Sequence, residues 1–295
     1  MLLYINSLKL INDMKIFRNL QLFGLLVIIY SLTQCTTAEV HESFSNELEE
    51  ITDDFSPKIT KVLENLGFNP IETKKDKVVF PDGTTNDFYT YQDMSYSDEA
   101  IEKIMNQEDT PTFEKQFRTF NTVGGNRNYT IAFFDFNQPF QRQAAGDAVF
   151  LFNNTLRTTI RLNIVFANGS NFASTPKDIA VFYLGNINTI AVADLPSNGL
   201  PGKNIRLNFR SNLIGTRARL RNTIMHEVGH TFGLRHTDFG LTGQAPDQFG
   251  RVPIPGTDTS GFDISSIMTS GQNSNPFGGY TDNDIRAIRF LYGFR

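Results

Sequence analysis

Apolar residues in the first part of the chain fall at helical spacing between residues 41 and 66. Pro57 breaks or kinks this predicted helix near its middle, because proline cannot donate a backbone hydrogen bond there, and Gly67 ends it. The other elements predicted before residue 116 are a strand at residues 77–80, a turn at residues 81–83 and a short helix capped by Ser97 that runs through Met105.

From residue 128 onward, strand-like and helical patterns alternate. The predicted strands are residues 129–136, 160–166, 178–184, 189–193 and 205–209, and a helix is predicted at residues 141–153. This order predicts an α/β (α+β) fold with a five-stranded twisted sheet and a backing helix. Residues 186–195 fit the sheet edge along a cleft, where an extended substrate could add as a strand, or else an ordinary edge strand.

Residues 217–234 form a further predicted helix with two unlike faces. Leu220, Ile224 and Val228 recur every four residues and give an apolar stripe. At about 100° per residue, Ile224 lies roughly 200° away from His226 around the helix axis. One face is therefore expected to pack into a core while the other faces a cleft.

The eleven residues from His226 to His236 have the pattern H-E-x-x-H-x-x-G-x-x-H. His226 and His230 are four residues apart, so they share one helix face and can reach one metal ion together. Glu227 is close enough to hold a water at that ion. Gly233 tolerates positive φ, so the backbone can turn there and bring His236 back as a third ligand. Three protein ligands leave a fourth position open, as in a catalytic zinc site.

A bare H-E-x-x-H occurs by chance in many helices, and a lone histidine is more often a hydrogen-bonded core residue than a ligand. The extended motif fixes five positions, so a chance match falls to roughly one in ten thousand or less at ordinary residue frequencies. We interpret it as a site for one catalytic Zn²⁺ ion, with Glu227 as the catalytic residue and His226, His230 and His236 as metal ligands.

A methionine-containing segment, residues 266–270 (Ser-Ile-Met-Thr-Ser), follows the third histidine. The motif and this turn together resemble the metzincin clan of zinc endopeptidases. The resemblance implies that Met268 lies beneath the metal as a hydrophobic floor. Within the clan, the sequence resembles the bacterial dual-action HEIGH metallopeptidases through residues 226–238 (HEVGHTFGLRHTD), residues 254–257 (Ile-Pro-Gly-Thr) and residues 263–268.

The resemblance covers roughly residues 116–295 and includes a C-terminal helix from Tyr280. Thr281 can cap that helix with Asp284 at its third position, and Gly293 can end it. Its predicted buried stripe is Ile285, Ile288 and Leu291. Some metzincins add a tyrosine near the metal, for which Tyr280 is a candidate, and Asp238 is expected to orient His236 or to stabilise the turn.

Residues 14–35 have the pattern of an export signal. Lys15 and Arg18 precede an apolar run at residues 23–32 that is short for a transmembrane helix. Met14 is a candidate start. The only cysteine, Cys35, follows this run at a position that resembles a bacterial lipobox, although Gln34 stands where a small residue is usual. We expect an exported protein, either a bacterial envelope lipoprotein (outer membrane or surface) or a secreted one.

The length and a hydrophobic content of 40% allow one sizeable core and a smaller appendage. We expect an export signal at residues 1–35, a propeptide-like or accessory region at residues 36–115 and a catalytic domain at residues 116–295. The front region is equally consistent with a helical spacer. We also hypothesise that residues 36 to about 115 inhibit the site until they are removed. With one cysteine, no disulfide can form, so packing and metal binding must provide stability.

The predicted function is that of a zinc-dependent endopeptidase in which Glu227 is the general base toward a metal-activated water. The alternatives are a non-catalytic zinc-containing surface lipoprotein that binds peptide or glycan, and a zinc hydrolase of small amides or peptidoglycan. The formal net charge of −4 is mixed along the chain and suggests no nucleic acid partner. We expect a monomer with a protein or peptide substrate, which meets a membrane only through a lipid anchor at Cys35.

Overall fold

A computed structural model describes a large part of the chain. The described residues are 55–105, 118–119, 121–124, 127–185, 187–238, 254–257, 263, 265–270 and 279–295. They belong to one compact unit, residues 53–295. The predicted export signal, Cys35 and the first half of the helix predicted at residues 41–66 lie outside the described residues. Within them, no helix is both long and apolar enough to span a membrane.

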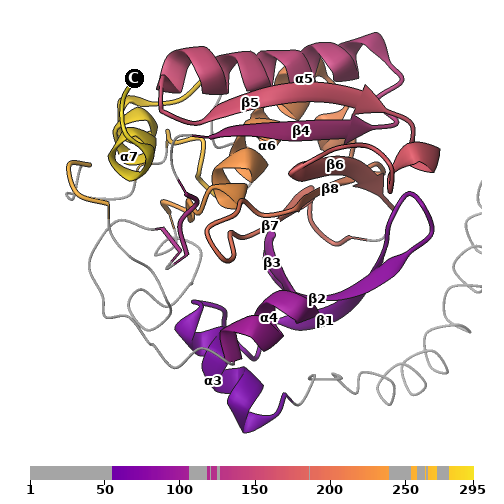
Figure 1. The fold of residues 1–295 in the computed structure, drawn as a ribbon, viewed down its shortest axis with the longest axis vertical. Coiled ribbons are helices and arrows are strands. Elements are labelled where there is room, and N and C mark those ends of the chain that lie inside the picture. The colour runs from indigo at the N-terminus through magenta and orange to yellow at the C-terminus, as the bar shows by residue number, and fades with distance from the viewer. Residues whose placement is uncertain are drawn as a thin grey trace, which may run out of the picture. The chain divides into compact units, whose positions relative to one another are not determined.

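The described residues contain one eight-stranded sheet with strand order β1-β2-β3-β7-β8-β6-β4-β5 (Figure 1). The strands are β1 (Lys74–Val79), β2 (Thr85–Tyr91), β3 (Met94–Ser97), β4 (Asn128–Phe134), β5 (Arg161–Ala167), β6 (Ile179–Leu184), β7 (Ala191–Asp194) and β8 (Asn204–Asn208). Strands β4, β5, β6 and β8 pair in parallel, β7 pairs antiparallel to β8, and β3 pairs in parallel with β7. Strands β1, β2 and β3 are antiparallel neighbours.

The helices described are α3 (Pro57–Asn65), α4 (Asp98–Met105), α5 (Pro139–Leu151), α6 (Arg217–Thr231) and α7 (Asp282–Tyr292). A π-helical turn, η1 (Phe152–Leu156), follows α5, and two 3₁₀ turns occur at η2 (Gly169–Asn171) and η3 (Asn212–Ile214). The helix predicted at residues 41–66 begins in the structure at Pro57, where the Ser56 side chain caps it. Proline is favoured at the first position of a helix, so Pro57 starts α3 rather than kinking a longer helix.

The prediction of a five-stranded sheet is not confirmed, because the sheet in the described residues has eight strands. Strands β4 to β8 fall on the five predicted segments and β1 overlaps the predicted strand at residues 77–80, but β2 and β3 were not predicted. In β2, Phe88 and its neighbour Tyr89 are both buried, so the strand lacks a simple alternation of apolar and polar positions. In β3, four residues are too few to establish a period. These strands lengthen the sheet beyond β7, which is therefore not its edge.

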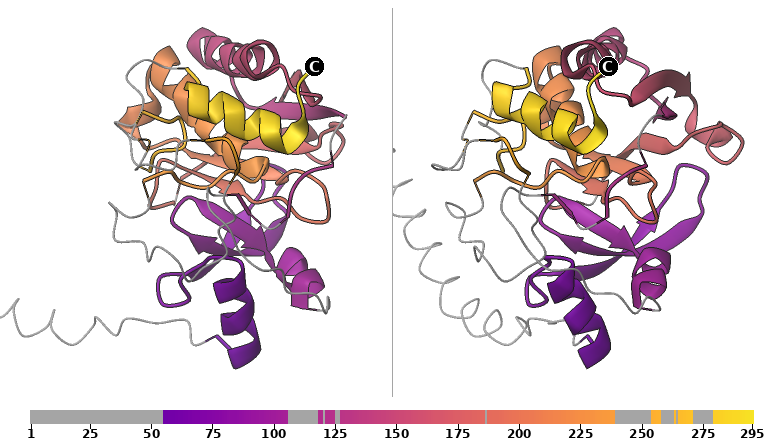
Figure 2. Two further views of the ribbon diagram at one scale, coloured as in Figure 1. Left: turned by 90° about the vertical axis from the view of Figure 1, so that its left-hand side faces the viewer. Right: turned by 60° about the vertical axis from the view of Figure 1, so that its left-hand side comes forward.

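Two apolar clusters cover the opposite faces of the central sheet. Ile131 and Phe133 of β4 belong to the larger cluster, which also contains residues of α5, α6 and α7. Their neighbours Ala132 and Phe134 belong to the cluster on the other face, beside Phe172. The alternation follows from the two-residue period of a strand. Figure 2 shows α5, α6 and α7 together on one side of the sheet.

The N-terminal region, defined as residues 55–105, has an apolar cluster of its own. Helix α4 packs against β2 and β3, and α3 packs against α4 (Figures 1 and 2). The buried members of the cluster are Leu63, Leu66, Phe68, Tyr89, Tyr91, Met94, Tyr96, Ile101 and Leu195. Leu195 directly follows β7, so the cluster joins this region to the central sheet. The predicted cap of α4 is confirmed, because Ser97 Oγ accepts a hydrogen bond from the Ala100 amide at 3.2 Å.

The buried face of α6 and the start of α7 agree with the sequence, whereas of the predicted stripe of α7 only Ile288 is fully buried and Ile285 and Leu291 are partly buried. Leu220, Ile224 and Val228 are at most 3% exposed and form the predicted buried stripe of α6. Thr281 and Asp284 make the reciprocal hydrogen bonds of a capping box at the start of α7. Local side-chain chemistry thus defines where α7 begins.

Candidate metal centre

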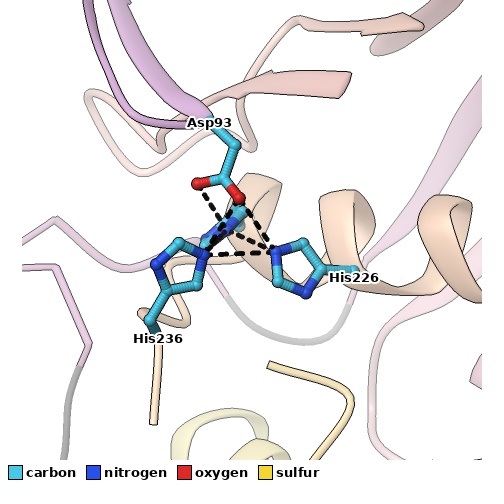
Figure 3. Close-up of side chains that lie close together, drawn as sticks. Asp93, His226 and His236 are labelled. Atoms are coloured by element: carbon cyan, nitrogen blue, oxygen red, sulfur yellow. Dashed lines mark hydrogen bonds and ion pairs between the residues drawn. The ribbon is translucent and has the colours of Figure 1, made fainter. Parts of the chain in front are cut away.

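The last turns of α6 carry His226, Glu227 and His230 of the motif. A turn at Gly233 then leads to His236. Gly233 has φ of +87°, as predicted from the sequence. The Leu234 amide donates to the Gly229 carbonyl at 2.9 Å, which closes the end of the helix. The backbone then reverses and brings His236 beside His226 and His230 (Figure 3).

The three imidazoles meet through their Nε2 atoms. His230 Nε2 lies 3.0 Å from His226 Nε2, and His236 Nε2 lies 3.3 Å from each of the other two. A tetrahedral zinc ion with bonds of about 2.0–2.1 Å holds its nitrogen ligands about 3.4 Å apart. The arrangement therefore fits the coordination of a zinc ion by three histidines.

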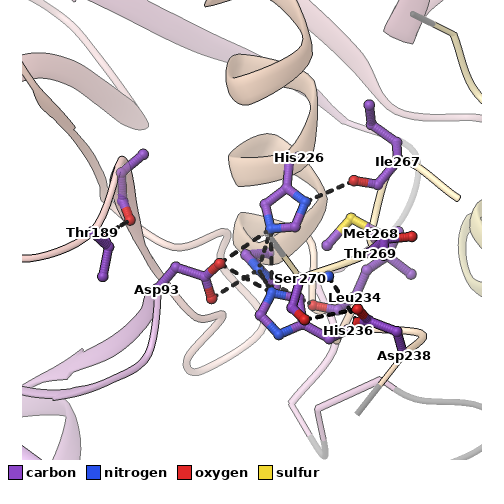
Figure 4. Close-up of polar contacts among 12 residues, drawn as sticks. Asp93, Thr189, His226, Leu234, His236, Asp238, Ile267, Met268, Thr269 and Ser270 are labelled. Atoms are coloured by element: carbon purple, nitrogen blue, oxygen red, sulfur yellow. Dashed lines mark hydrogen bonds and ion pairs between the residues drawn. The ribbon is translucent and has the colours of Figure 1, made fainter. Parts of the chain in front are cut away.

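Backbone carbonyls determine which ring nitrogen faces the centre. His226 Nδ1 lies 2.7 Å from the Ile267 carbonyl oxygen, and His230 Nδ1 lies 2.8 Å from that of Leu234 (Figure 4). A carbonyl can only accept, so both Nδ1 atoms donate and, in the neutral rings, both Nε2 atoms carry lone pairs. Lone pairs directed at one point are the donor set that a cation requires.

A fourth side chain, Asp93, points into this centre from the turn between β2 and β3 (Figure 3). Its Oδ2 atom lies 3.0 Å from His236 Nε2 and 3.4 Å from His226 Nε2, and Oδ1 lies 3.5 Å from His230 Nε2. The four residues each offer a ligand atom within 4.8 Å of the others. Sequence reasoning missed Asp93, because it precedes His236 by 143 residues and no short motif includes it.

The charges of the centre are strongly coupled. Burial disfavours the ionised Asp93 carboxyl, but the imidazoles around it outweigh this effect and hold its pKa well below its usual range. Burial likewise disfavours protonated His226, yet the hydrogen bond with Asp93 raises its pKa to about 9. For His230 burial dominates and lowers the pKa to about 4. Asp93 thus supplies the negative charge that a cation among the imidazoles would balance.

Glu227 is 3% exposed, and among the described residues its Oε2 atom has no hydrogen-bond partner. Burial raises the pKa of this carboxyl well above its usual value. A cation at the neighbouring imidazoles would favour the ionised form and so oppose that effect. The two influences therefore act on the pKa of Glu227 in opposite directions.

Met268 is buried against α6 beside the histidines. A Cβ atom placed on Gly229 would lie 2.3 Å from Met268 Sδ, so this close approach depends on glycine. The Thr237 amide donates to the Met268 carbonyl at 3.0 Å. This hydrogen bond connects the methionine turn, residues 266–270, to the residue that follows His236. The Met268 side chain therefore approaches α6 at Gly229, which lies between His226 and His230 in the sequence.

The turn is also fixed to α7 through a buried carboxylate. Asp284 accepts hydrogen bonds from the Ile267 amide, at 3.0 Å, and from the Ser266 hydroxyl. Because the Ile267 carbonyl binds His226 Nδ1, the α7 cap reaches the metal centre through one short loop. Burial raises the pKa of Asp284 above its ordinary value, against the effect of these hydrogen bonds.

Residues 88–292 match the family of dual-action HEIGH metallo-peptidases. The chain belongs to this family. The match begins within β2 and includes Asp93, the histidine motif and the whole of α7. A metallopeptidase family implies a bound metal, and the cluster of Asp93, His226, His230 and His236 is a group of residues in the described part of the chain that could hold one.

Other known proteins resemble this metallopeptidase over shorter stretches or more weakly. Serralysin G of Dickeya chrysanthemi is 38% identical over 77 residues, a match that covers 25% of this chain and 16% of that protein. Two solved structures of myroilysin are 14% and 15% identical, each with a TM-score of 0.39. They cover 59% of this chain and 96% and 86% of their own chains, respectively.

In this HEIGH metallopeptidase, Asp238 stabilises the methionine turn. Its carboxylate accepts hydrogen bonds from the amide and the hydroxyl of Ser270, each at 2.8 Å. His236 Nδ1 has no hydrogen-bond partner among the described residues, so of the two predicted roles the backbone contact is the one observed. Tyr280 packs against the main apolar cluster, and its role near the metal stays a prediction.

Proposed function

We propose that this metallopeptidase is a zinc-dependent endopeptidase in which Glu227 is the general base. The observation that carries the proposal is the convergence of three Nε2 atoms within 3.0–3.3 Å of one another, with Glu227 on the same helix. Two of the three rings have their tautomer set by a backbone carbonyl. Three neutral imidazoles favour zinc among the common divalent ions.

The roles of the residues follow from their chemistry. His226, His230 and His236 would hold one zinc ion, which when bound acidifies water and polarises the substrate carbonyl. Glu227 accepts a proton from the attacking water and delivers it to the leaving amine. Its burial keeps bulk water from competing for that proton.

A protein or peptide substrate is favoured over a small amide because a β-strand runs beside the centre. The Ala193 amide of β7 donates to the Asp93 carbonyl at 2.9 Å. A peptide backbone that lies next to the metal centre can therefore form hydrogen bonds with the main chain of β7. An extended peptide could bind by main-chain pairing with such a strand. From the sequence alone, we also propose that the protein is an exported monomer. It is either anchored by a lipid at Cys35 or secreted without an anchor.

The test is cleavage of a quenched-fluorescent peptide library by the purified full chain loaded with zinc. We expect internal cuts, identified by mass spectrometry, that disappear in Glu227→Ala and on chelation while zinc content in the variant is kept. Glu64→Ala, which alters an exposed carboxylate of α3, is the matched control. Zinc binding with cleavage unaffected by Glu227→Ala would reject the assigned base. Zinc binding without any cleavage, in a protein whose metal is open to a small external ligand, would favour a peptide- or glycan-binding protein.

A further inference from the structure

We infer that Asp93 is a fourth ligand of the metal and that the N-terminal region keeps the site in a latent state. This inference rests on the proposed function and concerns the regulation of that same site. A catalytic zinc site needs one coordination position that water and substrate can occupy. A protein carboxylate in that position would close the site to both.

The geometry of Asp93 is that of a ligand rather than a neighbour. Its carboxylate oxygens lie 3.0–3.5 Å from the three Nε2 atoms, which are themselves 3.0–3.3 Å apart. One ligand atom from each of the four residues lies within 4.8 Å of the others, so the four side chains could bind one ion together. Asp93 reaches the centre from the connection between β2 and β3, whereas His226 is on α6 (Figures 3 and 4).

The turn that presents Asp93 has an unusual backbone. Tyr91 pairs with Met94, so Gln92 and Asp93 form the two-residue connection between β2 and β3. Gln92 has φ of +58°, a conformation that disfavours residues with a Cβ atom. Such strain persists where the surroundings hold the chain in place, and it is frequent at functional sites.

The strand that follows Asp93 occupies the side of β7 on which a substrate would pair. The Ala193 amide donates to the Asp93 carbonyl and the Leu195 amide donates to the Ser95 carbonyl, both at 2.9 Å. Those amides are the donors that an added peptide strand would use. In the N-terminal region, Asp93 thus occupies the fourth coordination position of the metal, and β3 occupies the side of β7 where a substrate strand would pair.

A buried polar network fixes β3 to the central sheet. Ser95 Oγ donates to Asp194 Oδ1 at 2.8 Å, and Asn204 Nδ2 donates to Asp194 Oδ2 at 2.6 Å. Arg206, which is 1% exposed, donates to Asp194 at 3.0 Å and to the Ser95 hydroxyl. Its guanidinium also lies 4.3 Å from the ring centroid of Phe88 in β2.

The zinc motif itself contacts the N-terminal region at a second point. Arg235 precedes His236, is 2% exposed and donates to the Gly67 carbonyl at 2.8 Å and to the Leu66 carbonyl at 3.4 Å. These carbonyls belong to the end of α3. Any displacement of the N-terminal region would therefore break hydrogen bonds on both sides of the metal, so the closed state is stable until such a displacement occurs.

Access to the metal tests this arrangement without relying on catalysis. The full chain is loaded with Co²⁺, and azide is titrated while the visible absorption is followed. We expect the wild-type protein to need at least about tenfold more azide than an Asp93 variant for the same response, because Asp93 fills the position that azide would take. Asp93→Ala should bind azide and should lose metal affinity by about 10–100-fold. Asp87→Ala, which alters a partly exposed aspartate of β2, is the control and should match wild type.

Asp93→Asn, which conserves size, replaces the alanine variant if that protein does not fold. Equal azide responses and equal metal affinities in the wild-type and Asp93 variants would overturn the inference.

A peptidase assay separates this inference from the proposed function. The double variant Asp93→Ala/Ser95→Ala removes the ligand and one attachment of β3, and its turnover should exceed that of wild type by about tenfold or more if the open state is otherwise populated at a tenth or less. Adding Glu227→Ala should abolish that turnover. If the double variant bound azide but cleaved no peptide, the inference of a closed metal site would stand and the proposed peptidase function would be rejected. Equal cleavage by wild type and double variant would keep the peptidase and reject latency.

Discussion

The two sides of the metal centre were specified in different ways. On one side, α6 and the glycine turn present three histidines that lie within eleven residues of each other. On the other, Asp93 comes from a hairpin that pairs with β7 about a hundred residues further along the chain. Both sides reach the same point, with Asp93 within 3.5 Å of every Nε2 atom.

This difference separates local from long-range specification. Helical spacing and one positive φ place the histidines, so a short motif is enough to predict them. Strand pairing places Asp93, and the partner of a strand is not written in the strand's own sequence. A motif that can be recognised in the sequence can therefore be only part of a site.

The largest expected effect comes from the side of the centre that the histidine motif forms. His230→Ala removes a fully buried imidazole that we propose as a metal ligand, and we expect zinc affinity to fall by at least about 100-fold, the upper end of the cost of losing an outer-shell partner. Isothermal titration of the metal-free protein measures this. His41→Ala, at the histidine outside the motif, should leave the affinity unchanged. If His230→Ala retained wild-type affinity, the three-histidine site would be wrong.

Arg235 connects the two sides, so its removal should weaken both. Arg235→Ala leaves the carbonyls of Leu66 and Gly67 without a charged donor, and we expect unfolding free energy to fall by about 2–3 kcal/mol. Urea denaturation with and without zinc measures the loss. Arg219→Ala on an exposed face of α6 should cost little. No difference between the two variants would mean that the contact with α3 contributes nothing.

A glycine-to-alanine pair tests the contact between α6 and the methionine turn. Gly229→Ala would place a methyl group 2.3 Å from Met268 Sδ, and we expect a loss of about 1–3 kcal/mol from overpacking. Gly146→Ala in α5 meets no atom within 4 Å and should instead stabilise by about 1 kcal/mol through helix propensity. Denaturation of the metal-free proteins decides, and effects of the same sign would contradict the packing assigned to Met268.

The smallest effect should come from the attachment of β3. Ser95→Ala removes one of several hydrogen bonds to Asp194, and we expect a loss of about 1 kcal/mol. Hydrogen exchange should become faster at the Ala193 and Leu195 amides, which β3 protects. Ser174→Ala, at an exposed serine, is the control. Unchanged exchange in Ser95→Ala would show that the network does not hold the strand.

Much of the fold was predictable wherever neighbouring residues decide it. The caps by Ser97 and Thr281 and the turn at Gly233 follow from side chains within three or four positions. The five strands from β4 to β8 also fell on predicted segments. Strands β2 and β3 did not, because β2 is buried on both faces and β3 has four residues.

The sequence by itself determined the helix that carries the motif, the spacing of its histidines and the glycine that ends it, since each depends on backbone geometry over a few residues. Only the tertiary structure decided that Asp93 completes the centre, that β3 covers β7 and that Gly229 admits Met268. These arrangements join residues far apart in the chain. Their physical cause is the packing of separate elements, which no local pattern records.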